Sequence, residues 1–216
     1  MIFRTKIFLN FLIATIFNLV PYKSTLFNSY RAFSIEEKLN LRVPYTNLQL
    51  INFFKDFSNE NKNITIFEYG SGSSTLFFED YFTNIYSVEH DENWFKVISK
   101  HIKKAKVFFV PPVNSDNPTT NSMKIGYKNL DFTDYVNFID KIGLSFDIIF
   151  IDGRARQECL KIAKNYLKPN GIIVLDDSNR NRYKKAISVL FPNNKILLLR
   201  GFGTYVPLLH QASIIF

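Results

Sequence analysis

Short apolar runs alternate with longer stretches of mixed polarity along most of this chain, and the alternation predicts its elements. The apolar runs are rich in β-branched residues and predict strands at 64–69, 84–88, 105–110, 146–151 and 171–175. Helices are expected at about 48–57, 73–82, 92–103, 132–142, 155–167 and 181–190. Thr46 or Asn47 is a candidate cap for the first helix, and Asp91 for the third. Strands and helices that alternate at this spacing indicate right-handed βαβ units and a parallel sheet.

The end of the chain departs from this alternation. Residues 195–200 and 211–216 are both strand-like, and the segment between them has no room for a crossover helix. Two strands joined in this way must run antiparallel. We therefore expect an α/β fold in which a mostly parallel sheet of seven strands ends in an antiparallel hairpin strand.

The N-terminal region has a different pattern. Residues 7–20 are the most apolar stretch, but they are too few to span a bilayer, and no signal-peptide cleavage site follows them. They predict a helix that covers the domain core, makes a dimer contact or lies on a membrane surface, and we favour packing on protein. With the connecting segment to residue 45, this gives two regions, 1–45 and 46–216. Peripheral membrane contact through residues 1–21 is the second interpretation.

Composition narrows the class of protein and its compartment. The chain of 216 residues has 46% hydrophobic and 21% charged residues, which is typical of a globular domain. Its single cysteine, Cys159, excludes an intrachain disulfide and favours a reducing compartment. We expect Cys159 to be a buried thiol and the protein to be cytoplasmic, with membrane association as the alternative.

The net charge of +8 is unevenly distributed. Residues 178–216 contain six Lys or Arg side chains and no Asp or Glu. The first interpretation is a solvated helix face, and the alternatives are an anionic substrate, an acidic membrane surface or nucleic acid. No nucleic-acid-binding motif is present, so nucleic acid is not expected as a partner.

The candidate chemistry lies where predicted strands end. Glu68 precedes the Gly70–Gly72 turn, Glu89-His90 ends the next strand, and Asp152-Gly153 and Asp176-Asp177 end two later ones. Open α/β sheets bind ligands at the carboxyl ends of their strands. A glycine turn with an acid at the tip of the next strand predicts a nucleoside-cofactor pocket, because that acid can accept both ribose hydroxyls.

Four segments in order, FEYGSGSST, SVEHD, FDIIFIDGRAR and LKPNGIIVLDD, resemble the motifs of class I S-adenosylmethionine-dependent methyltransferases. The resemblance covers residues 46–216. It implies a Rossmann-like three-layer sandwich, and the terminal hairpin agrees with that family's seven-stranded sheet. Thr75 stands where a dinucleotide fingerprint requires its third glycine. The implied cofactor is therefore S-adenosylmethionine.

The resemblance also implies roles for individual residues. Glu68 is expected near the methionine amino group, and the turn of Gly70, Ser71, Gly72 and Ser73 along the amino-acid portion. Glu89 is expected at the ribose hydroxyls, His90 beside the adenine, and Asp152 where cofactor and acceptor meet. We expect Trp94 to belong to the core.

Asp152, Arg154 and Asp177 are the candidate catalytic residues. Asp152, Asp176 and Asp177 resemble the acids of the catechol O-methyltransferase branch, which implies a divalent cation such as Mg²⁺. Here Asp-Asp replaces that branch's Asp-Asn, and Arg154 and Arg156 stand around the position of its lysine base. Alternatively, Asp177 or Ser178 only caps a helix. The two arginines bind an anionic acceptor or pair with Asp152 or Glu158.

The sequence thus predicts a methyltransferase that methylates oxygen on a small molecule or glycan. One alternative is a nicotinamide-dependent oxidoreductase, and another is a non-catalytic, membrane-associated binding protein of the same fold. No oligomeric state is predicted.

Overall fold

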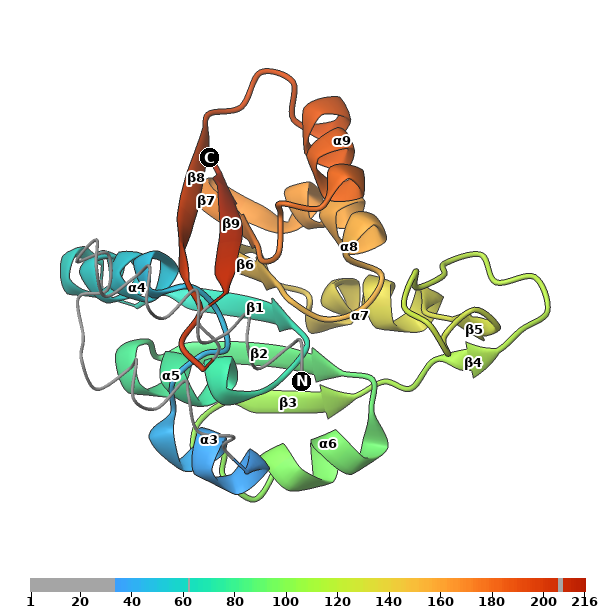
Figure 1. Cartoon of the computed structure of the whole chain (residues 1–216), viewed down its shortest axis with the longest axis horizontal. Helices are drawn as coiled ribbons and strands as arrows, with labels where there is room; N and C mark the ends of the chain where they lie inside the picture. The colour runs from blue at the N-terminus through green and yellow to red at the C-terminus, as the bar shows by residue number, and fades with distance from the viewer. Residues whose placement is uncertain (1–33, 62, 206–207) are drawn as a thin grey trace.

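The computed structural model describes residues 34–61, 63–205 and 208–216. Seven strands of this part form one sheet in the order β3-β2-β1-β6-β7-β9-β8 (Figure 1). They are β1 (Thr65–Tyr69), β2 (Asn84–Glu89), β3 (Lys106–Phe109), β6 (Phe146–Ile151), β7 (Leu167–Leu175), β8 (Ile196–Phe202) and β9 (Leu209–Ile215). All pairs are parallel except those of β9, which runs antiparallel to both β7 and β8. The predicted sheet is confirmed.

Helices cover both faces of this sheet. They are α3 (Ile35–Leu41), α4 (Leu48–Glu60), α5 (Ser73–Tyr81), α6 (Glu92–Ile98), α7 (Thr133–Ile142), α8 (Arg156–Ala163) and α9 (Asn181–Leu190). Asn47 caps α4 and Asp91 caps α6, as expected. Helix α6 is shorter than predicted, because the buried carboxylate of Glu79 accepts hydrogen bonds from the backbone N–H groups of residues 103–105 and turns the chain into β3.

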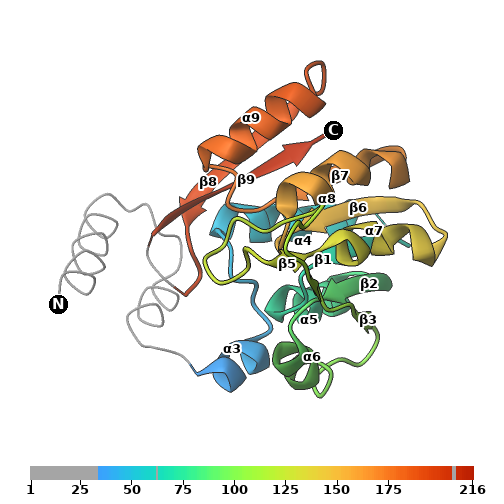
Figure 2. The same cartoon turned by 90° about the vertical axis from the view of Figure 1, so that its right-hand side faces the viewer.

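Side chains on the central strands point alternately to the two helical layers. Ile66, Ile148 and Phe150 pack with α4 and α5, whereas Phe67, Ile149 and Ile151 pack with α7, α8 and α9. The strands are buried on both faces, which explains their continuous apolar runs. Figure 2 shows α9 alongside the β8–β9 hairpin, and Ile187 and Ile215 share one apolar cluster there. The predicted three-layer sandwich is confirmed, and Cys159 is buried in it as expected.

Helix α3 was not predicted, because residues 22–45 show no hydrophobic period. Ser34 and Glu37 form a capping box at its start, and Leu39 is buried against Leu76 of α5 and Ile98 of α6. Both views place α3 beside α6 (Figures 1 and 2). A single buried leucine anchors this helix, so the sequence carries too few apolar positions to show a period. Residues 34–45 therefore pack on the sheet domain.

The predicted apolar helix of residues 7–20, and with it the alternative of membrane contact through residues 1–21, lies outside the described residues. Within the described ranges, no helix is long and apolar enough to cross a membrane.

A small ribbon follows β3, where the sequence indicated only a polar loop. Strands β4 (Val113–Asn114) and β5 (Leu130–Asp131) pair antiparallel and project from the edge of the main sheet (Figure 1). Asp131 accepts hydrogen bonds from the backbone N–H groups of Thr119 and Thr133, at 2.6 and 2.8 Å. These contacts hold the base of the 115–129 loop beside the carboxyl ends of the strands.

Candidate functional site

The turn after β1 is built on two glycines from different strands. Gly70 has a φ of +95°, a conformation that L side chains rarely adopt, and its N–H donates to Val88 O at 2.9 Å. A Cβ on Gly70 would lie 2.6 Å from Gly153 Cα, and a Cβ on Gly153 would lie 2.0 Å from Tyr135 Oη. The turn therefore requires both residues to be glycine. The sequence marked Gly153 only as part of a polar cluster.

Gly72 and Ser73 are placed differently. Gly72 has an extended φ of 174°, and an added Cβ would meet nothing closer than 3.8 Å. Its N–H donates to Thr75 Oγ1 at 2.9 Å, and Ser73 begins α5. Neither residue lines the cavity described below. The steric argument for glycine thus holds at Gly70 and not at Gly72.

Glu68 lies behind the turn, fully buried on the side of the sheet that faces α5. Its two carboxylate oxygens accept hydrogen bonds from Ser74 Oγ and Thr75 Oγ1, each at 2.5 Å. Burial, opposed by these hydrogen bonds, raises the pKa of Glu68 to about 7. The residue does not line the cavity. Glu68 therefore supports the turn after β1 and the start of α5. It could contact a ligand in the cavity only if the side chains around it rearranged.

Glu89 joins the ends of β1 and β2. Its Oε2 accepts from the backbone N–H and the hydroxyl of Ser71 at 3.0 and 3.1 Å. Its Oε1 accepts from the backbone N–H groups of His90 and Asp91, both at 2.8 Å. Glu89 is only 2% exposed but contributes to the cavity lining. The structure thus brings the two predicted strand-end clusters together through this carboxylate.

His90 lies among aromatic rings. The centroids of Tyr127, Phe132 and Tyr135 are 5.8, 5.7 and 5.9 Å from the imidazole. Both ring nitrogens are buried and without a hydrogen-bond partner among the described residues, although Nδ1 is 2.7 Å from Glu89 Oε1. Buried polar atoms are normally paired. The Nε2 atom, without such a contact at the cavity edge, fits a ligand with its own polar edge, such as a purine.

These residues surround a cavity of about 340 Å³. It is lined by Gly70, Ser71, Glu89, His90, Asp91, Trp94, Lys124, Tyr127, Asp152, Gly153 and Arg154. Trp94, expected in the core, packs partly on it and also lines this cavity, where its Nε1 donates to Ser71 O at 2.6 Å. The sequence places Trp94 three residues after the capping Asp91, in the first turn of the helix that follows β2, and this position could have indicated that it lies near the strand ends. Tyr127 comes from the 115–129 loop, which carries no recognisable motif.

Arg156 joins the loops that follow β6 and β7. It is 9% exposed, and its guanidinium donates to the backbone oxygens of Gly153, Asp152 and Asp176 at 3.1, 2.6 and 2.8 Å. The same group lies 2.7 Å from Asp152 Oδ1 and 3.7 Å from Asp177 Oδ2. Arg156 therefore pairs with Asp152, which is one of the two interpretations that the sequence left open.

The three strand-end aspartates differ in environment. Asp152 lines the cavity with a side chain 29% exposed, and burial together with Asp176 and Asp177 raises its pKa against the effect of Arg156. Asp176 is buried, accepts from Thr46 Oγ1 at 2.8 Å, and has a pKa raised by that burial.

Asp177, in a left-handed conformation with φ of +54°, pairs with Arg156, Arg180 and His210. Burial opposes ionisation, but the His210 hydrogen bond and the two arginines lower the pKa of Asp177 to about 2.

This arrangement does not fit the cation predicted for Asp152, Asp176 and Asp177. In the part of the chain that the structure describes, no group of three or more His, Cys, Asp or Glu side chains is arranged to hold a metal ion. Arg156 lies between Asp152 and Asp177, while Asp176 faces Thr46. The helix-cap alternative also fails, because α9 begins after Arg180 without a side-chain cap.

Arg154 faces the cleft. Its guanidinium carbon and the ammonium of Lys124 each lie 5.3 Å from the centroid of the Tyr127 ring. The Nε atom of Arg154 is buried and has no hydrogen-bond partner among the described residues. Of the two arginines in the DGRAR segment, Arg154 is thus the one presented to a ligand.

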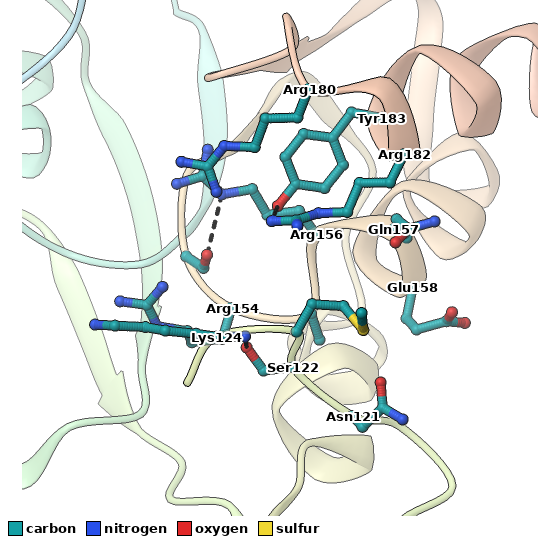
Figure 3. Close-up of a pocket in the computed structure, with 13 residues that line it drawn as sticks. Asn121, Ser122, Lys124, Arg154, Arg156, Gln157, Glu158, Arg180, Arg182 and Tyr183 are labelled. Carbon is teal, nitrogen blue, oxygen red and sulfur yellow. Dashed lines mark hydrogen bonds between the residues drawn. The ribbon is translucent and has the colours of Figure 1, made fainter. Parts of the chain in front are cut away.

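Figure 3 shows the residues that line a second cavity, of about 420 Å³. It is lined by Asn121, Ser122, Met123, Lys124, Gly153, Arg154, Ala155, Arg156, Gln157, Glu158, Arg180, Arg182 and Tyr183. Lys124, Gly153 and Arg154 line both cavities. A ligand in one cavity therefore lies next to a ligand in the other.

The chain is similar in fold to solved structures of two methyltransferases and of a decarboxylase. An O-methyltransferase from Bacillus cereus in complex with SAH (S-adenosylhomocysteine) superposes with a TM-score of 0.57 at 14% identity, covering 95% of this chain and 96% of that one. The precorrin-6y C5,15-methyltransferase from Geobacter metallireducens superposes with a TM-score of 0.52 at 13% identity, covering 76% of this chain and 86% of that one. The precorrin 8w decarboxylase from Methanobacterium thermoautotrophicum superposes with a TM-score of 0.53 at 15% identity, covering 80% of this chain and 91% of that one.

No protein-family model and no curated protein sequence matches the chain. The likeness thus concerns the fold alone, a Rossmann-like fold that this chain shares with the solved methyltransferases.

Proposed function

We propose that this protein is an S-adenosylmethionine-dependent methyltransferase that methylates an oxygen atom of a small molecule or glycan. The observation that carries the proposal is the cavity at the carboxyl ends of β1, β2 and β6, where Glu89 and His90 lie beside the Gly70 turn. The shared fold supports it, because open α/β sheets bind ligands at this edge.

The residues of the first cavity fit the parts of this cofactor. Glu89 would accept the ribose hydroxyls in exchange for the hydroxyl of Ser71, which it now binds at 3.1 Å. His90 would lie at the adenine, where its buried Nε2 would find a partner. The Gly70–Ser71 backbone and Trp94 would border the remainder. When bound, the cofactor would supply a methyl group attached to a positively charged sulfur. An acceptor oxygen would bond to the methyl carbon in line with the carbon–sulfur bond, and the sulfur would leave as part of S-adenosylhomocysteine.

Asp152 is the residue best placed to accept the acceptor's proton. It borders the first cavity, and its Oδ1 is held 2.7 Å from Arg156. No hydrogen bond from a described residue reaches its other oxygen. A raised pKa makes this carboxylate a stronger base than an ordinary aspartate. Asp177, with a pKa of about 2, is a weaker base and borders neither cavity, so we assign it a positioning role through Arg156.

Calorimetric titration of the full-length protein with S-adenosylhomocysteine and, separately, with NADH tests the proposal. We expect the homocysteine product to bind and NADH not to bind. Glu89→Gln should weaken product binding about tenfold or more, because charged hydrogen bonds to hydroxyls are lost. Glu92→Gln, at an exposed position of α6 outside the cavity, is the matched control. Binding of NADH alone would instead identify a nicotinamide-dependent protein.

A further inference from the structure

We propose that the second cavity binds a phosphate group carried by the methyl acceptor, so that the acceptor is a phosphorylated small molecule or glycan. The identification of this ligand as the acceptor rests on the proposed function. The anion site itself rests only on the side chains of the cavity.

The cavity lining is strongly positive. Five cationic side chains contribute to it, from the 115–129 loop, from the end of the β6–α8 connection and the first residue of α8, and from the residues around the start of α9: Lys124, Arg154, Arg156, Arg180 and Arg182. Glu158 is the only acidic residue in the lining, and it pairs with Lys161 at 2.7 Å. The cavity therefore holds an excess of positive charge that its own acid does not neutralise.

Three of these cations have no carboxylate partner among the described residues. Arg156 pairs with Asp152, and Arg180 pairs with Asp177. The remaining three, Lys124, Arg154 and Arg182, form no ion pair with a described residue. Positive charges gathered at one cavity repel each other. A bound anion is attracted to each of them and so offsets that repulsion.

All three of these cations lie over aromatic rings, Lys124 and Arg154 over Tyr127 and Arg182 over Tyr183. The guanidinium carbon of Arg182 lies 4.7 Å from the Tyr183 ring centroid, and its Nη2 donates to Tyr183 Oη at 3.3 Å. The buried Nε of Arg154 has no hydrogen-bond partner in the part of the chain that the structure describes. In Figure 3, Arg180 and Arg182 lie in the upper part of the view, at the start of α9, and Lys124 and Arg154 lie in the lower part. Such an orientation lowers the entropy cost of binding.

Phosphate fits this arrangement better than carboxylate. A phosphate monoester carries close to two negative charges at neutral pH and three terminal oxygens. It can therefore contact more than one of the ammonium and guanidinium groups that line the cavity, and arginine binds such oxygens bidentately. A carboxylate has a single charge and two oxygens in one plane. The shared lining by Lys124 and Arg154 places this anion next to the first cavity.

Titration calorimetry with inorganic phosphate at constant ionic strength tests the site, with acetate as the second probe. We expect phosphate to bind more tightly than acetate. Arg182→Gln should weaken phosphate binding about tenfold, because a charge-assisted contact is lost. Lys184→Gln removes the same charge from an exposed position of α9 outside the cavity and should leave the phosphate affinity within about twofold. Lys124→Gln, on a different element, should also weaken phosphate binding.

Equal phosphate affinity of Arg182→Gln and Lys184→Gln would overturn the site, as would acetate binding at least as tightly as phosphate. S-adenosylhomocysteine is titrated into the same samples, where its unchanged affinity in Arg182→Gln shows that the variant is folded. If the wild-type protein binds phosphate in the expected pattern but not S-adenosylhomocysteine, the anion site stands and its identification with a methyl acceptor is overturned.

Discussion

Gly70 and Gly153 lie back to back, and a Cβ on Gly70 would be 2.6 Å from Gly153 Cα. They follow the neighbouring parallel strands β1 and β6, whose last residues Tyr69 and Ile151 are paired in register. The close approach brings the cofactor-side turn against the loop that carries Asp152 and Arg154. Both cavities therefore depend on the same glycine contact.

Gly70→Ala should destabilise the protein, whereas Gly72→Ala should not. At Gly70 the new methyl group meets the backbone of Gly153 in a left-handed conformation, which should cost at least about 2 kcal/mol. At Gly72 the nearest atom is 3.8 Å away, so the free energy of unfolding should stay within about 0.5 kcal/mol. Urea denaturation of the two variants measures this difference, and equal effects would contradict the steric account.

Arg156→Gln should lower the free energy of unfolding by about 3 kcal/mol, because it leaves the partly buried carboxylates of Asp152 and Asp177 without their common cation. Arg154→Gln is the matched control in the same loop. It has no ion pair among the described residues and should change stability by less than about 1 kcal/mol. The reverse order in urea denaturation would show that Arg156 does not hold the two loops together.

Glu68 should make stability fall as the pH rises. Its pKa is raised from 4.5 to about 7 in the folded protein, chiefly by burial. Between these pH values the folded protein keeps a proton that the unfolded chain has lost, so the stabilising contribution is complete below pH 4.5 and lost through pH 7. Glu68→Gln cannot ionise and should gain up to about 3 kcal/mol over wild type at pH 8. Denaturation at pH 5 and pH 8 provides the test, and parallel pH profiles would refute it.

Asp152→Asn should reduce kcat by about 10² to 10⁴-fold while S-adenosylhomocysteine still binds, because the amide cannot accept the acceptor's proton. In the wild-type enzyme the rate should rise with pH through the raised pKa of Asp152, since only the ionised carboxylate acts as a base. Asp116→Asn, at an exposed position of the 115–129 loop, is the control and should keep normal turnover. An unchanged pH profile in Asp152→Asn would assign the proton to another group.

Removal of divalent metal should have no effect on cofactor binding or thermal stability, because Arg156 supplies the positive charge between Asp152 and Asp177. S-adenosylhomocysteine affinity and the thermal midpoint should agree within error in EDTA and in excess Mg²⁺. A midpoint raised by Mg²⁺ in wild type, and not in Asp177→Ala, would instead restore the cation site that the sequence indicated.

Local patterns in the sequence were sufficient for most of the fold. The strand at 146–151 and the helix at 181–190 have the predicted bounds. Helix α3 and the β4–β5 ribbon were missed, because each is held by distant partners rather than by its own periodicity. Leu39 of α3 packs on Leu76 and Ile98, and Asp131 of β5 binds the backbone of Thr119.

The candidate site shows the same division. Motifs placed Glu89, His90 and Asp152 at one edge of the sheet, and the structure brings all three to one cavity. The motifs did not separate Arg154 from Arg156, since the two residues are only two positions apart in one loop. The left-handed Ala155 between them, with φ of +48°, turns Arg156 towards Asp152 while Arg154 lies over Tyr127.

By itself, the sequence determined the order of strands and helices, the glycine turn and the positions of the strand-end acids, because these depend on hydrophobic period and on residues close along the chain. Only the tertiary structure decided that Glu68 is a buried support, that Arg156 lies where a metal was expected, and that three cations without an ion pair among the described residues line a second cavity. The physical reason is that charge pairing and burial depend on distances through space. Arg182 is 58 residues from Lys124 in the chain, yet both line the same cavity.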